Sequence, residues 1–258
     1  MARKIQLAVD IGRRAVRRAK IRSGRRTTLA ATLFETIPSQ VDAEDPVAVG
    51  SMLADSMARA GIDPGPAVFA LDRSITSLKR LTLPTDDPDE LPDMVRLAVE
   101  RELPIDAEDA VIDFSIIDRS ADGFVVETVA VPRREIERIE RIADAAGMRV
   151  ARVAPRCHGA MRLADSTEPT LVLDVTGEGF ELGLVDHGRL RWSRGVSIEG
   201  ADPGGPTAEE LVPEIRRSWL SYRVSAGEIE TPMLLILGGE QIADVVGGIS
   251  EATGLTAQ

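Results

Sequence analysis

The chain has 258 residues, a formal net charge of −11 and 43% hydrophobic residues, which argues against a disordered chain and a general nucleic-acid binder. Aromatic residues make up only 3%, so the cores must be built from Val, Ile, Leu and Ala. No apolar run is long enough to span a membrane, and residues 1–5 lead into a strand-like segment and not a signal peptide. The single cysteine, Cys157, excludes an internal disulfide, so we expect a folded cytoplasmic protein.

The first part of the chain predicts the order strand, strand, strand, helix, strand. Its first apolar strand runs directly into Asp10, and Met52, Leu53 and Met57 recur at helical spacing in the predicted helix. The expected elements are residues 4–9, 14–22, 27–37, 45–60 and 66–71.

The last part of the chain repeats this order. An apolar strand again ends in an aspartate, Asp174, and the expected elements are residues 170–173, 180–185, 189–198, 206–224 and 233–237. Gly238 and Gly239 are then expected to open a last helix. A duplication of this length predicts two similar lobes and not a solenoid.

The segment between the two halves predicts a small α+β subdomain. Its expected elements are a strand at 78–83, a helix at 86–101, a hairpin of 110–117 and 123–131, a helix at 133–146 and a strand at 148–153. We therefore divide the chain into a first lobe (1–77), an inserted subdomain (78–154) and a second lobe (155–258) that returns toward the first.

Four stretches, which cover nearly the whole chain, carry a resemblance to a known family. The most specific is Leu91–Ile105, followed after the predicted hairpin by Val129–Arg133. The others are residues 9–12 with Arg17 downstream, residues 173–174 with 186–190 and 194–200, and residues 237–239. In these stretches the chain resembles the type IV pilus assembly protein PilM and, more distantly, the cell-division protein FtsA and the cytoplasmic part of the type II secretion protein GspL.

The resemblance implies an actin-like (ribonuclease H-like) α/β fold of two duplicated lobes with an inserted α+β subdomain. It further implies a cytoplasmic scaffold at the inner membrane that docks the N-terminal tail of a PilN-like membrane protein between the first lobe and the insertion. Leu103, Pro104 and Ile105 would be near that tail. The chain ends earlier than the family pattern, so we expect either a relative with a shortened C-terminus or a fragment. The sequence also leaves open whether the chain serves a pilus, a competence or a type II secretion system.

The resemblance also implies a cleft for ATP and Mg²⁺. In this superfamily two turns cradle the phosphates with backbone N–H groups, and two aspartates hold the metal, mostly through water. Asp10 and Asp174 would be those metal ligands. The nucleotide would be lined by Asp10, Gly12, Arg13, Arg17, Asp174, Thr176, Gly177, Gly238 and Gly239.

The chain departs from that pattern at the phosphate-binding turns. Arg13 and Arg14 stand where the family has Ser or Thr, Arg17 replaces a lysine, and Glu178 brings negative charge to the second turn. Two interpretations therefore stay open: a nucleotide-binding cleft, and turns that keep the geometry of the fold without the ligand. The same fold also leaves open an active ATPase or small-molecule kinase and an FtsA-like, self-associating filament former, although no catalytic residue stands out.

The second predicted strand is rich in basic residues. Arg14, Arg18, Lys20 and Arg22 share one face, because alternate residues of a strand point the same way. Such a face is typical of a solvated sheet edge, and it could also contact anionic lipid or an acidic partner surface.

Overall fold

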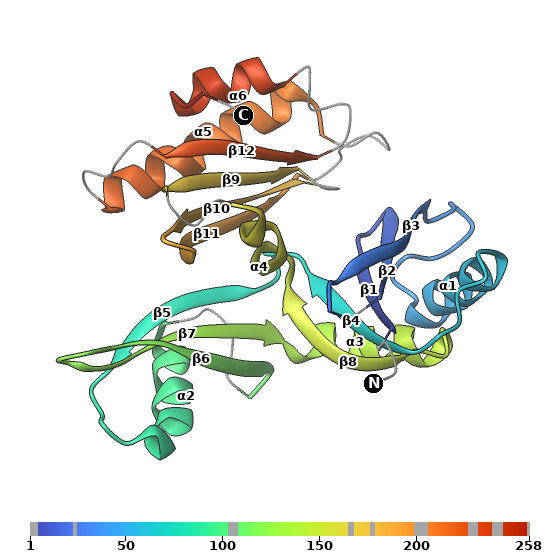
Figure 1. The fold of residues 1–258 in the computed structure, drawn as a ribbon, viewed down its shortest axis with the longest axis horizontal. Helices are drawn as coiled ribbons and strands as arrows, with labels where there is room; N and C mark the ends of the chain where they lie inside the picture. The colour runs from blue at the N-terminus through green and yellow to red at the C-terminus, as the bar shows by residue number, and fades with distance from the viewer. Residues whose placement is uncertain are drawn as a thin grey trace.

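The computed structural model describes residues 5–22, 25–102, 108–164, 168–175, 179–198, 206–226, 232–238 and 245–256. These residues form three β-sheets with their covering helices, and the three bodies meet near the short helix α4 (Figure 1).

The first sheet has the strand order β3-β2-β1-β4-β8. Its strands are β1 (Ile5–Ile11), β2 (Ala15–Arg22), β3 (Thr28–Thr36), β4 (Pro66–Leu71) and β8 (Arg149–Pro155). The first three are joined antiparallel, whereas β1, β4 and β8 are parallel. The helices α1 (Pro46–Arg59) and α3 (Arg133–Ala145) cover one face of this sheet (Figure 1).

Local chemistry explains how α1 begins and which of its faces packs on the sheet. The Asp45 carboxylate accepts a hydrogen bond from Val47 N at 2.9 Å, which caps the first turn. Val49, Leu53 and Met57 are buried at a spacing of four, so they form one apolar stripe against the sheet.

The second sheet has the strand order β11-β10-β9-β12. Its strands are β9 (Thr170–Val175), β10 (Gly179–Asp186), β11 (Arg189–Ser197) and β12 (Met233–Gly238). The helices α5 (Ala208–Ala226) and α6 (Val246–Thr253) cover one face, and α4 (Arg156–Ala160) with the 3₁₀ turn η2 (Met161–Leu163) packs on the other.

The packing of α5 follows from its sequence. The Glu210 carboxylate accepts a hydrogen bond from Thr207 N at 2.8 Å, which satisfies a donor at the start of the helix. Leu211, Ile215 and Trp219 then follow at a spacing of four and are buried against the sheet. The indole of Trp219 donates to Thr253 O, so α5 is tied to α6.

The third sheet has the strand order β5-β7-β6 and its own core. Its strands are β5 (Ser77–Leu83), β6 (Ala110–Ser120) and β7 (Gly123–Pro132), and the 3₁₀ turn η1 (Pro88–Glu90) leads into the covering helix α2 (Leu91–Glu102). Leu91, Val95 and Val99 form the buried stripe of α2.

The structure contains the predicted repeat of strand, strand, strand, helix, strand, as β1-β2-β3-α1-β4 and β9-β10-β11-α5-β12. It differs from the expected layout in two places. The strand β8 pairs with β4 and is therefore part of the first sheet, and the helix α3, which leads into β8, packs on that sheet. We had expected both elements in the inserted subdomain. Gly238 is the last residue of β12 and does not open a helix, and residues 239–244, which follow it, lie outside the described residues.

Candidate functional site

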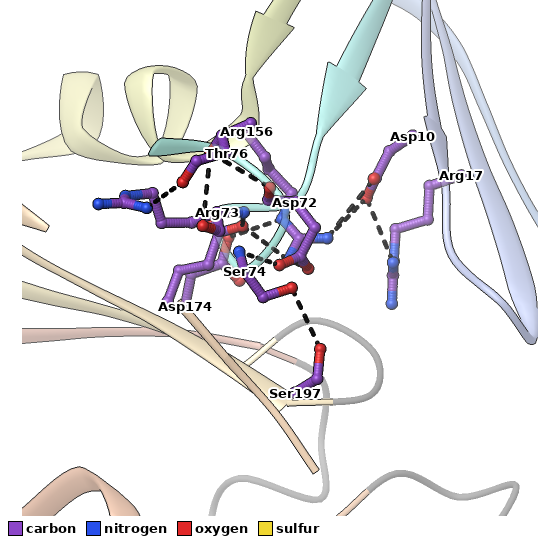
Figure 2. A network of polar contacts seen from close by, with 10 residues as sticks. Asp10, Arg17, Asp72, Arg73, Ser74, Thr76, Arg156, Asp174 and Ser197 are labelled. Carbon is purple, nitrogen blue, oxygen red and sulfur yellow. Dashed lines mark hydrogen bonds and ion pairs between the residues drawn. The ribbon is translucent and has the colours of Figure 1, made fainter. Parts of the chain in front are cut away.

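Asp10 and Asp174 occupy equivalent places in the two lobes. Asp10 lies near the end of β1 and Asp174 near the end of β9, and each of these strands has one parallel and one antiparallel neighbour. Their neighbours Val9 and Leu173 are buried against the covering helices. Because side chains alternate along a strand, both aspartates point to the opposite face of their sheet, where the two lobes meet. Figure 2 shows them in one polar network.

Arg156 is the cation at the centre of this network. It follows directly after β8 as the first residue of α4, and its side chain is 14% exposed. Its guanidinium nitrogens lie 3.4 Å from Asp10 Oδ2, 2.7 Å from Asp72 Oδ2, 3.9 Å from Asp174 Oδ2 and 2.9 Å from Glu181 Oε1. We call Arg156 and these four acids the Arg156 cluster.

The acids of the Arg156 cluster come from both lobes. Asp10 and Asp72 belong to the first lobe: Asp10 is near the end of β1, and Asp72 directly follows the parallel strand β4. Asp174 and Glu181 belong to the second sheet, where they are paired across β9 and β10. Arg156 therefore bridges two sheets through ion pairs as well as through the chain.

Burial and charge act in opposite directions on these groups. The side chain of Glu181 is fully buried, and this burial raises its pKa to about 7 although Arg156 lowers it. Burial lowers the pKa of Arg156, but Glu181, Asp10, Asp72 and Asp174 together outweigh it and the pKa lies above its usual value. The guanidinium is thus permanently charged, as a buried carboxylate beside it requires.

A turn of the first lobe inserts against the second sheet next to the cluster. Arg73 N donates to Glu181 Oε1 at 2.8 Å, and the Arg73 guanidinium donates to Ser193 Oγ at 2.8 Å. Ser74 Oγ and Ser197 Oγ lie 3.1 Å apart (Figure 2). The approach needs a glycine in β11, because a methyl group on Gly195 would lie 2.5 Å from Ser74 N.

The residues of the predicted first phosphate turn are only partly brought to the cluster. Arg17 Nη1 lies 3.3 Å from Asp10 Oδ2, and its guanidinium also stacks over Phe34 at 5.6 Å. Gly12 N donates to Ala15 O and closes the tight turn, while the side chain of Arg13 is exposed. Arg17 thus contacts the predicted metal ligand itself.

The remaining predicted residues divide into two groups. Gly238 ends β12 and is paired in register with Val175, so it lies at the same end of the second sheet as Asp174. The other six lie outside the described residues: Leu103, Pro104, Ile105, Thr176, Gly177 and Gly239.

The expectation of a solvated basic face on β2 is wrong for Arg18. This side chain is buried under α1, where Nη2 donates to Glu35 Oε2 and to Ser56 Oγ, both at 2.7 Å. Lys20 is half-buried beside Met57. The shared face was predicted correctly, but it is the face that the helix covers, and only Arg14 and Arg22 are exposed.

Mg²⁺ does not fit between Asp10 and Asp174 in this arrangement. The metal requires carboxylate oxygens or its own waters at about 2.1 Å in octahedral geometry. Arg156 already lies against the carboxylates that would bind the metal, Asp10 of the first lobe and Asp174 of the second. Asp10 is also contacted by Arg17. Among the residues the structure describes, no group of three or more His, Cys, Asp or Glu side chains is arranged to hold a metal ion.

The sequence patterns did not single out four residues of this site: Asp72, Arg73, Arg156 and Glu181. Two signals were visible. Asp72 follows the apolar strand 66–71, in the same way that Asp10 and Asp174 follow theirs, and Glu181 is a lone acid in an apolar strand. No local signal marks Arg156, which is 146 residues away from Asp10.

Neither Cys157 nor His158 forms a nucleophile–base pair. Cys157 is fully buried, and burial raises the pKa of its thiol to about 12. His158 Nε2 lies 3.3 Å from Glu127 Oε2 on the inserted sheet.

Comparison with solved structures confirms the actin-like fold. The PilM-PilN type IV pilus biogenesis complex contains a chain that superposes with a TM-score of 0.83 and 18% identity, over 99% of this chain and 88% of that one. The cytoplasmic domain of EpsL, an inner-membrane component of the type II secretion system of Vibrio cholerae, gives 0.59 and 16%, over 92% and 87%. A Bacteroides thetaiotaomicron protein with an actin-like ATPase fold gives 0.56 and 7%, over 99% and 91%.

The predicted resemblance to PilM is thus confirmed as a likeness of structure. No family model and no curated protein matches the sequence. Within the described part of the chain, no helix is long and apolar enough to cross a membrane.

Proposed function

We propose that this chain is a cytoplasmic actin-like scaffold at the inner-membrane platform of a type IV pilus or secretion system. The observation that carries the proposal is the match along almost the full length to the PilM-PilN complex, which includes the inserted sheet as well as both lobes. The second supporting likeness, to the cytoplasmic domain of EpsL, is to a protein of another such platform.

The proposed partner is a membrane protein with a short, PilN-like N-terminal tail in the cytoplasm. An extended tail needs a groove lined by small and aliphatic side chains. We place its contacts at Leu103, Pro104 and Ile105. The described residues on either side support this proposal: α2 ends at Glu102, and β6 begins at Ala110, which pairs with Pro132 immediately before α3.

Nucleotide binding was the other function expected from the sequence. The geometry of the site does not favour a scaffold that requires a bound nucleotide. The aspartates that would hold Mg²⁺ are neutralised by Arg156 and Arg17. We therefore propose a scaffold that does not depend on ATP, with an ATPase or small-molecule kinase as the competing function. The two are separated by whether purified protein releases phosphate from ATP in the presence of Mg²⁺.

Tail binding is tested in two steps. The tagged chain is first used to capture partners from detergent-solubilised membranes, and a synthetic peptide of the captured protein's N-terminal tail is then titrated into the purified chain by calorimetry. We expect saturable binding of the peptide at one site. Failure of every tail peptide to bind, together with turnover of ATP, would show that the scaffold proposal is wrong.

The residues at the contact are tested by Leu103→Asp and Ile105→Asp. A charge in an apolar groove removes a buried anchor, so we expect each change to weaken tail binding at least about tenfold. The matched control is Leu97→Asp, the same chemical change at a side chain of α2 that is 49% exposed. If the control and the two variants bind the peptide equally well, the tail docks elsewhere.

A further inference from the structure

Arg156 holds the position that a divalent cation would need between the two lobes. The two strand-end aspartates lie on either side of its guanidinium, and Asp72 and Glu181 complete the surrounding negative charge (Figure 2). We infer that Arg156 is an internal cation that replaces a bound metal at Asp10 and Asp174 and joins the two lobes without a nucleotide.

The chemistry of the guanidinium suits this role. It is planar, carries five N–H donors and keeps its charge at every physiological pH, so one group can serve several carboxylates at once. Nη1 lies toward Asp10 and Nη2 toward Asp72 and Glu181, whereas Nε is 3.9 Å from Asp174 Oδ2, which is an ion-pair distance and not a hydrogen bond. A metal bonded to Asp10 and Asp174 would need the same oxygens and would have to displace the arginine.

The position of Arg156 in the chain makes the link structural. It stands between β8, the edge strand of the first sheet, and α4, which packs on the second sheet. Two of its partners come from each lobe, and Glu181 is fully buried. Loss of the cation would remove the ion pair of the fully buried Glu181 and those of the other three acids, and removing one partner of a buried ion pair destabilises a protein strongly.

The first test uses the unaltered chain. We expect that MnCl₂ produces no bound-manganese signal in electron paramagnetic resonance, and that Mg²⁺ with ATP leaves the melting temperature unchanged. Saturable binding of Mn²⁺ or of Mg²⁺-ATP that disappears in Asp10→Asn would overturn the inference.

The second test removes the cation with Arg156→Ala. In EDTA we expect the melting temperature to fall by roughly 10 °C, because buried acids lose their partner. Millimolar Mg²⁺ or Mn²⁺ should restore part of this loss, since the metal can then occupy the vacated position. The matched control is Arg152→Ala, which removes an exposed arginine of β8 and should show neither effect.

Three outcomes of the second test are decisive. A melting temperature for Arg156→Ala equal to that of the unaltered chain would overturn the inference, and so would a destabilised variant that no divalent cation rescues. If Arg156→Ala does not fold, Arg156→Lys takes its place: it keeps one charge but cannot bridge four carboxylates, so an intermediate melting temperature with partial rescue by Mn²⁺ is expected. An Arg156→Lys variant as stable as the unaltered chain, and indifferent to Mn²⁺, would contradict it.

Discussion

At the scale of single residues, the surroundings of an arginine decide what it can do. Arg18 and Arg156 are both largely shielded from water, and each is paired with acidic side chains: Arg18 with Glu35, and Arg156 with four acids. Arg18 ties β2 and β3 to α1, and Arg156 ties one lobe to the other. Neither is free to bind an external anion in this structure.

The role of Arg18 is tested by Arg18→Met. The change removes the hydrogen bonds to Glu35 and Ser56, while Glu35 keeps its contact with Arg59 at 3.1 Å. We expect a loss of about 2 kcal/mol in the free energy of unfolding, measured by urea denaturation. The control Arg22→Met alters an exposed residue and should cost less than about 0.5 kcal/mol.

The same pair of variants tests the membrane interpretation of the basic strand. Binding to vesicles that contain anionic lipid should be no weaker for folded Arg18→Met than for the unaltered chain, because Arg18 is covered by α1. A specific loss of vesicle binding in Arg18→Met, with binding kept in Arg22→Met, would contradict the burial seen in the structure.

At the scale of elements, close approach between the lobes depends on one strand and one turn. The turn that follows β4 carries Arg73 and Ser74 onto β10 and β11. Gly195 permits this because it has no side chain at the point of contact. The resemblance in residues 194–200 that we noted in the sequence therefore includes a residue with a clear steric purpose.

Gly195→Ala should disturb this contact. The added methyl group would lie 2.5 Å from Ser74 N and 2.6 Å from Arg73 C, both of them backbone atoms, so the turn must move. We expect a loss of about 2 kcal/mol in the free energy of unfolding, typical of overpacking. The control Gly247→Ala lies in α6 with open space around the added atom, and it should be neutral or slightly stabilising.

The helices and strands themselves were largely predictable from the sequence, whereas the way in which they pair and pack against one another was not. Strand alternation and the spacing of apolar residues in α1, α2 and α5 are local properties, so the repeated order of elements follows from them. Alternation placed Arg18 and Lys20 on one face of β2, but it does not reveal which face a helix will cover. The pairing of β8 with β4 is likewise set by tertiary structure, since the two strands are separated by the whole inserted sheet.

At the scale of the whole molecule, the two lobes keep the duplicated architecture of the actin-like fold, and Arg156 contacts acids of both lobes at their junction. The sequence predicted the paired aspartates Asp10 and Asp174 because each ends an apolar strand. It did not predict what lies between them, because the contact between Arg156 and Asp10 joins residues that are 146 positions apart in the chain. The departures at Arg13, Arg14 and Glu178 were the reason why the sequence left open turns that keep the geometry of the fold without the ligand.

This arrangement is compatible with a scaffold whose shape does not vary with a bound ligand. Four ion pairs of Arg156 and the contacts of the Arg73 turn hold the second sheet against the first. We expect the affinity of the tail peptide to be the same in EDTA and in Mg²⁺ with ATP. Calorimetric titration under the two conditions checks this, and a tail that binds only with nucleotide would show that the lobes are coupled to a ligand.

The most direct measurement is a crystal structure of the chain soaked in MnCl₂, with anomalous diffraction data collected to locate manganese. Replacement of the metal by Arg156 predicts electron density for the guanidinium between Asp10 and Asp174 and no anomalous peak there. A manganese peak bonded to both aspartates, with Arg156 turned away from the cleft, would contradict it.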